Sequence, residues 1–317
     1  MIRRLLLAAA AALLSVPAAA QQPPPPRLLV VISVDGLSTG LWDEYRPQFS
    51  GGLAQLASGT VFRNGSSSTQ SANALGDVIK QQSAGSRDVA VSGRQGATSA
   101  ISGNGADQRW YWTGSAFGTD RPAARVPKVL PRVNAAVAAA LSQARPPLEP
   151  TPFCASKGGA GAAAQLGRPA GDVAAFRASP ELDGDTLALA AGLTDEMQLG
   201  RGAAPDLLAV GLAGTSYVQQ AYGAQGEQMC LQLTELDREI GDFLALLDRR
   251  GIDYAVALTG TGEGQVPVLF WRPGFRGATV EAPASPADVR KTLGVLVGLP
   301  AGGDGRCLEG TPAFCAE

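Results

Sequence analysis

A nearly continuous hydrophobic stretch close to the start of the chain constrains the fold more than any other segment. Residues 28–34 (LLVVISV) are rich in β-branched side chains and show no regular alternation of polar and apolar positions. A strand with this pattern is buried on both faces, as in sheets that helices cover on both sides. Asp35 and Gly36 follow it directly. The stretch therefore predicts a buried strand of an α/β sheet that ends at Asp35.

Strand-like and helix-like segments alternate along the rest of the chain. Short apolar runs predict further strands at residues 89–91, 207–212, 254–258 and 266–271. Helices are predicted at residues 52–58, 74–82, 133–143, 186–199, 228–249 and 288–297. Asp183 and Asp185 are capping candidates for the helix at 186–199, and Gly251 is placed just after the helix at 228–249. The alternation predicts the α/β class, with a central, mostly parallel sheet flanked by helices on both faces.

The first twenty residues have the pattern of an export signal. Residues 1–4 form a short n-region with two arginines, residues 5–14 form an Ala/Leu core, and Ala18 and Ala20 precede Gln21 in a small-x-small pattern. The core is shorter than the ~18 apolar residues that span a bilayer, so cleavage is favoured over an uncleaved anchor, and no membrane anchor is expected later. We expect a signal peptide at 1–20, a stiff proline-rich spacer at 21–26, and one α/β domain at 27–317 in a periplasmic or secreted protein.

The four cysteines are expected to form disulfides, because an exported protein meets an oxidising compartment and no CxxC spacing indicates a metal site. Four cysteines allow three pairings. Cys307 and Cys315 are eight positions apart in a tail that contains Gly and Pro, which favours a local loop. That choice leaves Cys154 to pair with Cys230.

Two features of the composition exclude whole classes of function. The chain has no histidine, which rules out Ser-His-Asp and Cys-His relays and HExxH zinc helices. Lys and Arg number 26 against 28 Asp and Glu, and no basic run is present. Nucleic-acid binding depends on clustered basic residues, so nucleic acid is not expected as a partner.

Polar residues follow three of the predicted strands, where α/β sheets collect their ligands. Asp35 follows the first, residues 214–220 (GTSYVQQ) follow the strand at 207–212, and residues 259–263 (TGTGE) follow the strand at 254–258. Asp35 is the only carboxylate directly at a strand end. An Asp before Gly is also a common turn former, and that interpretation stays open.

Two further segments need an interpretation. Trp110, Tyr111 and Trp112 form an aromatic cluster, which is either a ligand platform or, as we favour, packing under a long excursion of the chain. Residues 158–171 are rich in Gly and Ala and are predicted to be a loose connector.

Several segments, in this order, resemble the alkaline phosphatase superfamily. They are residues 27–37 (RLLVVISVDGL), 45–49 (YRPQF), 51–56 (GGLAQL), 61–65 (VFRNG), 89–93 (VAVSG), 107–110 (DQRW), 177–183 (RASPELD) and 266–270 (VPVLF). Within this superfamily, the chain resembles secreted bacterial phosphatases of the PafA and sphingomonad type, grouped with type I phosphodiesterases and nucleotide pyrophosphatases. The resemblance covers most of the mature chain, which is shorter than its relatives.

The resemblance implies a site with two zinc ions and a Thr or Ser nucleophile that attacks phosphate esters. Asp35 matches a zinc ligand of the family. The other matched ligand positions carry poor ligands in this chain: Ser216 stands for an Asp, Gln220 for a His, and Thr261 and Gly262 for an Asp and a His.

Other parts of the family's site have no clear match. The family's nucleophile block should follow residues 61–65, but residues 66–69 (SSST) lead almost directly into the helix at 74–82. The segment with the last zinc-binding His should precede Val266 and is also missing. Arg94 falls on a phosphate-binding Lys and Gly96 on an Arg.

These differences favour an exported pseudophosphatase with no bound zinc, because hydroxyls and amides are poor substitutes for anionic and imidazole ligands. One alternative is a residual phosphate-ester hydrolase with a nucleophile among residues 66–69 and an oxygen-ligated Mg²⁺ or Ca²⁺ near Asp35 and Glu263. Another is a non-catalytic protein that binds a small anion or a protein partner through Arg94 or the aromatic cluster. A monomer is expected from the resemblance.

Overall fold

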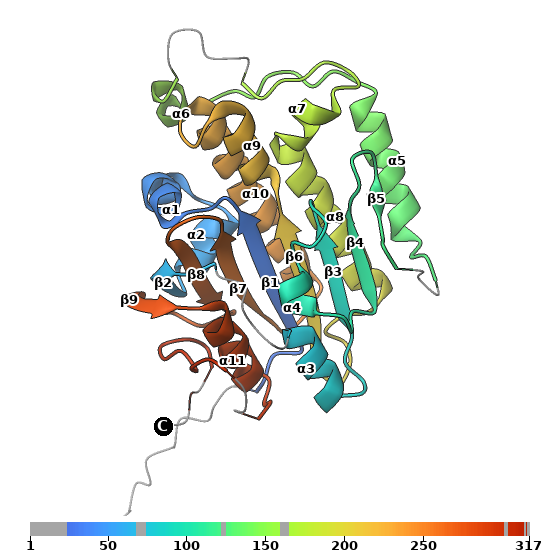
Figure 1. Ribbon diagram of the computed structural model, residues 1–317, viewed down its shortest axis with the longest axis vertical. Helices are drawn as coiled ribbons and strands as arrows, with labels where there is room; N and C mark the ends of the chain where they lie inside the picture. Colours follow the sequence, from blue (N-terminus) through green and yellow to red (C-terminus); the bar gives the residue numbers. More distant parts are fainter. Residues whose placement is uncertain are drawn as a thin grey trace, which may run out of the picture.

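The computed structural model describes residues 24–67, 74–121, 125–158, 165–300, 304–313 and 315. Within these residues, one sheet of nine strands has the order β5-β4-β3-β6-β1-β7-β8-β2-β9 (Figure 1). The strands are β1 (Leu28–Asp35), β2 (Thr60–Gly65), β3 (Asp88–Ser92), β4 (Gln108–Trp112), β5 (Phe117–Gly118), β6 (Asp206–Leu212), β7 (Tyr254–Thr261), β8 (Val266–Trp271) and β9 (Thr279–Ala284). β4, β3, β6, β1 and β7 are parallel neighbours, whereas β5 and β8 run antiparallel to β4 and β7. The predicted α/β class and mostly parallel sheet are confirmed.

Helices cover both faces of the sheet (Figure 1). They are α1 (Thr39–Tyr45), α2 (Gly52–Ala57), α3 (Leu75–Gln82), α4 (Ser99–Ser102), α5 (Val129–Leu141), α6 (Pro152–Ser156), α7 (Val173–Arg177), α8 (Pro180–Glu196), α9 (Gly214–Tyr222), α10 (Glu227–Arg249) and α11 (Pro286–Leu296), with a 3₁₀ turn at Arg46–Gln48. β1 shows why both faces need cover. Val30 and Ile32 belong to the core under α2, α5, α8 and α10, whereas Leu29 and Val31 belong to the core under α3 and α11.

The helix predicted at 186–199 was placed wrongly. It begins at Pro180, where Ser179 is the N-cap residue and its hydroxyl accepts the backbone N–H of Glu181. A Ser-Pro pair is itself a strong start for a helix, because Pro has no N–H to leave unpaired. Asp183 and Asp185 therefore lie inside α8 and do not cap it. The carboxylate of Asp183 instead accepts hydrogen bonds from the backbone at the beginning of α9.

The other predicted helices are present with shifted ends. The elements that were not predicted are α1, β2, α4, β4, β5, α6, α7, α9 and β9. α10 matches the longest predicted helix, and Gly251 follows its C-cap Arg250 with φ +60°, as expected for a C′ glycine. Trp110 and Trp112 are buried in β4, and the Trp112 ring lies 5.3 Å from that of Phe176. The packing interpretation of the aromatic cluster is confirmed.

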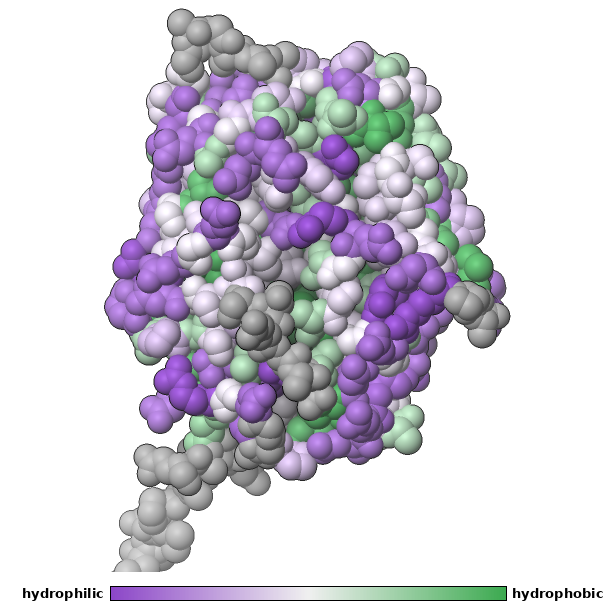
Figure 2. All heavy atoms as spheres, viewed as in Figure 1, coloured by the Kyte–Doolittle hydropathy of each residue, from purple (hydrophilic) through white to green (hydrophobic). Residues whose placement is uncertain are grey.

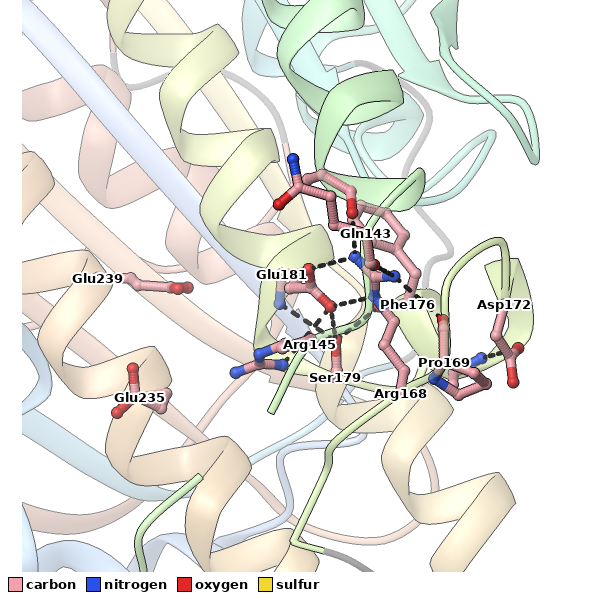
Figure 3. Close-up of polar contacts among 12 residues, drawn as sticks. Gln143, Arg145, Arg168, Pro169, Asp172, Phe176, Ser179, Glu181, Glu235 and Glu239 are labelled. Carbon is pink, nitrogen blue, oxygen red and sulfur yellow. Dashed lines mark hydrogen bonds and ion pairs between the residues drawn. The ribbon is translucent and has the colours of Figure 1, made fainter. Parts of the chain in front are cut away.

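Residues 158–171 are not loose throughout, although 159–164 lie outside the described residues. Arg168 is 4 % exposed, and its guanidinium donates to both carboxylate oxygens of Glu181 at 2.7 and 2.9 Å (Figure 3). It also donates to the backbone carbonyls of Ala140 and Gln143 at 2.8 and 2.9 Å. These contacts hold the end of α5 and the segment after it against the start of α8.

Both expected disulfides are present. Cys154 of α6 pairs with Cys230 of α10 across 76 positions, and Cys307 pairs with Cys315 in the C-terminal segment. The predicted signal peptide at 1–20 and residues 21–23 of the spacer lie outside the described residues. Pro24 is held to the body of the molecule, because the Arg272 guanidinium donates to its carbonyl at 3.1 Å.

The surface has little continuous apolar area on the face seen in Figure 2, where hydrophilic residues predominate and hydrophobic ones form small patches. In the described ranges, no helix combines the length and the apolar character needed to cross a membrane.

Candidate functional site

The carboxyl ends of β1, β3, β6 and β7 meet at one edge of the sheet, where parallel α/β sheets hold their ligands. An open pocket of about 460 Å³ lies there. Its lining residues are Asp35, Gly36, Arg94, Ser216, Gln219, Gln220 and Gly262. Residues singled out from four separate sequence segments thus come together in one place.

Asp35 is the last residue of β1 and is the only carboxylate among the lining residues. Its side chain is only 15 % exposed, and both of its oxygens have partners. One oxygen forms an ion pair with the Arg94 guanidinium, and the other accepts a hydrogen bond from the Thr261 hydroxyl. The carboxylate charge is therefore already balanced by a side chain of this chain.

Gly36 allows a helix to approach this carboxylate. Its φ is +83°, and its N–H donates to the Thr261 carbonyl at 2.8 Å. A Cβ at this position would lie 2.9 Å from the Gln219 side-chain oxygen and 3.1 Å from the Ser216 Cα. Only glycine fits both the backbone conformation and the contact with the first turn of α9.

α9 carries two of the positions that the resemblance identifies with lost zinc ligands. Ser216 and Gln220 are one turn apart, and the Gln220 amide donates to the Ser216 hydroxyl at 3.0 Å. Both groups lie on the pocket side of the helix, and both are uncharged. They therefore add oxygen atoms but no negative charge to the site.

Asp183 fixes the beginning of α9 from a distance. One of its carboxylate oxygens accepts the backbone N–H groups of Ala213 and Gly214 at 2.9 Å each. The other accepts the Gln232 amide at 3.0 Å. Complete burial raises the pKa of Asp183 to about 6, although the three hydrogen bonds oppose the rise. α8 and α10 thus position the helix that presents Ser216 and Gln220.

In the described part of the chain, neither the predicted nucleophile segment nor Glu263 lines the pocket. Ser67 is near it, since its hydroxyl donates to the Gly262 carbonyl, but it is not a lining residue. Ser68 and Thr69 lie outside the described residues. Glu263 is exposed in the turn between the antiparallel strands β7 and β8 and does not line the pocket either. Gly96 is also exposed and away from the lining.

Sequence reasoning missed Gln219 and the role of Gly36. The position of Gly36 directly after a buried strand was visible in the sequence, but the need for glycine comes from the approach of α9. Gln219 carried no sequence pattern of its own, because its place beside Gly36 depends on where α9 packs.

The donor groups of the pocket do not fit a pair of zinc ions. Two dications held ~4 Å apart repel strongly and need anionic and imidazole ligands around them. A catalytic zinc ion normally takes three good protein ligands, and hydroxyls and amides bind it poorly. This pocket offers one carboxylate already paired with Arg94, and nowhere in the described part of the chain do three or more Cys, Asp or Glu gather in a metal-binding arrangement.

Comparison with known proteins shows what this arrangement is similar to. Residues 89–268, more than half of the chain, match the family model described as type I phosphodiesterase / nucleotide pyrophosphatase. The matched range contains the carboxyl ends of β3, β6 and β7 and the residues that follow them, whereas Asp35 at the end of β1 precedes it.

Two curated relatives match over a similar length. The chain is 36 % identical over 201 residues to alkaline phosphatase PhoD of Zymomonas mobilis, and 38 % identical over 202 residues to alkaline phosphatase PhoK of a Sphingomonas species. Each match covers 60 % of this chain but only 34 % and 35 % of the respective relative. The matched part of this chain therefore spans about a third of the length of these curated relatives.

The fold is also similar to that of a solved enzyme. The crystal structure of wild-type alkaline phosphatase PafA superimposes with a TM-score of 0.64 at 18 % identity, over 76 % of this chain and 63 % of PafA. At this identity the similarity concerns the fold alone.

Proposed function

Since this chain belongs to the type I phosphodiesterase / nucleotide pyrophosphatase family of the alkaline phosphatase superfamily, we propose that it is a non-catalytic member, a pseudophosphatase. In this role the chain does not hold the two zinc ions of the family and does not hydrolyse phosphate esters. The observation that carries it is the pairing of Asp35 with Arg94 and Thr261 in a pocket whose other lining side chains are neutral.

Phosphoryl transfer at such a site would lack its two main contributions. Metal ions in hydrolases stabilise charge on the phosphoryl oxygens and lower the pKa of a nucleophile, and each effect contributes several kcal/mol. A serine hydroxyl without a metal ion needs a neighbouring base, and the chain has no histidine. The Ser67 hydroxyl donates to a backbone carbonyl, which is not a base that could activate it.

The pocket also lacks a free cation for a phosphate group. Arg94 is the only basic residue among the lining residues, and its charge is balanced by Asp35. An incoming oxyanion would have to break that ion pair before it could take the guanidinium. The expected role of Arg94 as a phosphate contact is therefore weakened by its own neighbour.

The protein is further proposed to work outside the cytoplasm, in the periplasm or as a secreted monomer, and not to bind nucleic acid. Two disulfides support an oxidising compartment. The signal peptide at 1–20 stays a prediction that N-terminal sequencing of the exported protein would test.

The test is hydrolysis of p-nitrophenyl phosphate and bis-p-nitrophenyl phosphate by the full chain, over a wide pH range and with zinc, magnesium or calcium added. We expect no release of nitrophenol above that of the matched variant Asp35→Ala. A secreted alkaline phosphatase with an intact zinc site serves as the positive control. Turnover by the wild-type chain that Asp35→Ala abolishes would contradict the proposal.

A further inference from the structure

Arg94 reaches the Asp35 carboxylate across an intervening strand. It follows β3, whereas Asp35 ends β1, and β6 lies between these two strands in the sheet. The backbone of Arg94 is held by its own neighbours, since its carbonyl accepts the Ser92 hydroxyl at 2.8 Å. Its side chain is 52 % exposed and passes over the end of the sheet to a carboxylate that is 15 % exposed. The guanidinium thus covers the Asp35 carboxylate from the solvent side.

The atoms around Asp35 are hard oxygen donors. The Thr261 hydroxyl is bound to the carboxylate, and the Ser216 hydroxyl and the Gln220 amide line the same pocket. No imidazole or thiolate is present among the lining residues. Oxygen-only sets of this kind favour Ca²⁺, Mg²⁺ or Mn²⁺ over Zn²⁺, with water completing the coordination.

We propose that the Arg94 guanidinium serves as a built-in cation that occupies the metal side of Asp35, and that its removal converts the pocket into a weak site for a single oxygen-ligated divalent cation. This inference rests on the proposed function and adds the reason why the wild-type pocket excludes metal ions. With Arg94 present, the Asp35–Arg94 pair has no net charge and attracts no dication. Without Arg94, the pocket keeps one desolvated carboxylate charge, which does attract one.

The experiment compares the wild-type chain with Arg94→Met, which keeps much of the length and apolar volume of the side chain but not its charge. Thermal unfolding and calorimetric titration are measured with CaCl₂ and MnCl₂ against an EDTA reference. We expect Arg94→Met to melt below the wild type in EDTA, to be restabilised by Ca²⁺ or Mn²⁺, and to bind these cations at least about tenfold more tightly than the wild type.

Two matched variants separate charge from packing. Arg94→Lys keeps a positive charge and should stay insensitive to the cations, and the double variant Arg94→Met/Asp35→Asn should lose the response of Arg94→Met. Equal stabilisation of the wild type and Arg94→Met, or no response of Arg94→Met, would overturn the proposal. Hydrolysis by the wild type would instead refute the proposed function, so the two failures are distinguishable.

A variant on the other side of the pair keeps the test valid if Arg94→Met does not fold. Asp35→Asn releases the guanidinium, so the chain should bind inorganic phosphate at least about tenfold more tightly than the wild type, measured by the same titration. An unchanged affinity for phosphate would show that the two charges do not neutralise each other and would overturn the proposal.

Discussion

Replacing Asp183 tests how the pocket is built, because this buried carboxylate joins α8 to the first turn of α9. Asp183→Asn keeps an oxygen that can accept the N–H groups of Ala213 and Gly214. The new amide can donate to Gln232, whose side-chain oxygen has no partner among the residues that the structure describes. Asp183→Ala removes every acceptor and leaves buried donors unpaired, at a cost of about 1–3 kcal/mol each. We expect Asp183→Asn to be far less destabilising than Asp183→Ala.

The change in unfolding free energy that Asp183→Asn causes depends on pH. Burial raises the folded-state pKa of Asp183 from 3.8 to about 6, so the native protein binds more protons than the unfolded chain between these two values. Stability contributed by the protonated carboxyl is fully present below about pH 4 and is lost as the pH rises through 6. The difference of roughly two pKa units corresponds to about 3 kcal/mol. Asparagine does not titrate. The unfolding free energy of the variant, relative to that of the wild type, should therefore rise by about 3 kcal/mol between about pH 4 and pH 7.

The assay is urea unfolding of both proteins, followed by far-ultraviolet circular dichroism at several pH values across this window. The difference between the two unfolding free energies reports Asp183 together with its charge effect on Glu239, whose pKa is raised by burial and by the Asp183 charge. The remaining buried carboxylates are common to both proteins. The chain has no histidine, so no imidazole titrates in the same window. Parallel stability curves for the wild type and Asp183→Asn would refute the reasoning.

Three other substitutions test separate parts of the structure. Arg168→Met removes the pair with Glu181 and the donors to two backbone carbonyls, and it should cost about 3 kcal/mol in chemical unfolding, because Arg145 at 3.6 Å still balances part of the Glu181 charge. An unchanged unfolding free energy would contradict this role of Arg168. Replacing Cys154 and Cys230 by serine removes a disulfide between residues 76 positions apart and should lower the unfolding free energy by about 2–4 kcal/mol. An unchanged unfolding free energy under oxidising conditions would show that the disulfide does not form. Gly36→Ala should lower the melting temperature, because a Cβ at this position would collide with α9 and the left-handed backbone costs alanine about 1–2 kcal/mol. An unchanged melting temperature would refute the close approach of α9 to residue 36.

The central strands and the longest helix were predicted well, because the hydrophobic patterns that identify them are local. The apolar run at 28–34 and the periodic residues of α10 identify buried elements without any knowledge of their neighbours. The beginning of α9 could not be predicted in this way. Its N–H groups are satisfied by Asp183, which lies 30 positions earlier in the chain and inside another helix. A helix start that is stabilised from a distance has no local pattern to show it.

Most residues of the candidate site could be predicted from the sequence, but the ion pair that neutralises Asp35 could not. Strand-end logic and the resemblance brought Asp35, Ser216, Gln220, Thr261 and Gly262 to one edge of the sheet. The ion pair with Arg94 depends on the strand order β3-β6-β1, which no local pattern encodes. The strand order therefore decides whether the Asp35 charge is free or neutralised by Arg94.

Whether the chain holds the zinc ions of its family is measured by its zinc content after equilibration with excess zinc and removal of unbound metal by gel filtration. The pairing of Asp35 with Arg94 predicts much less than one zinc ion per chain, with no difference between the wild type and Asp35→Ala. Two zinc ions per wild-type chain, lost in Asp35→Ala, would contradict it.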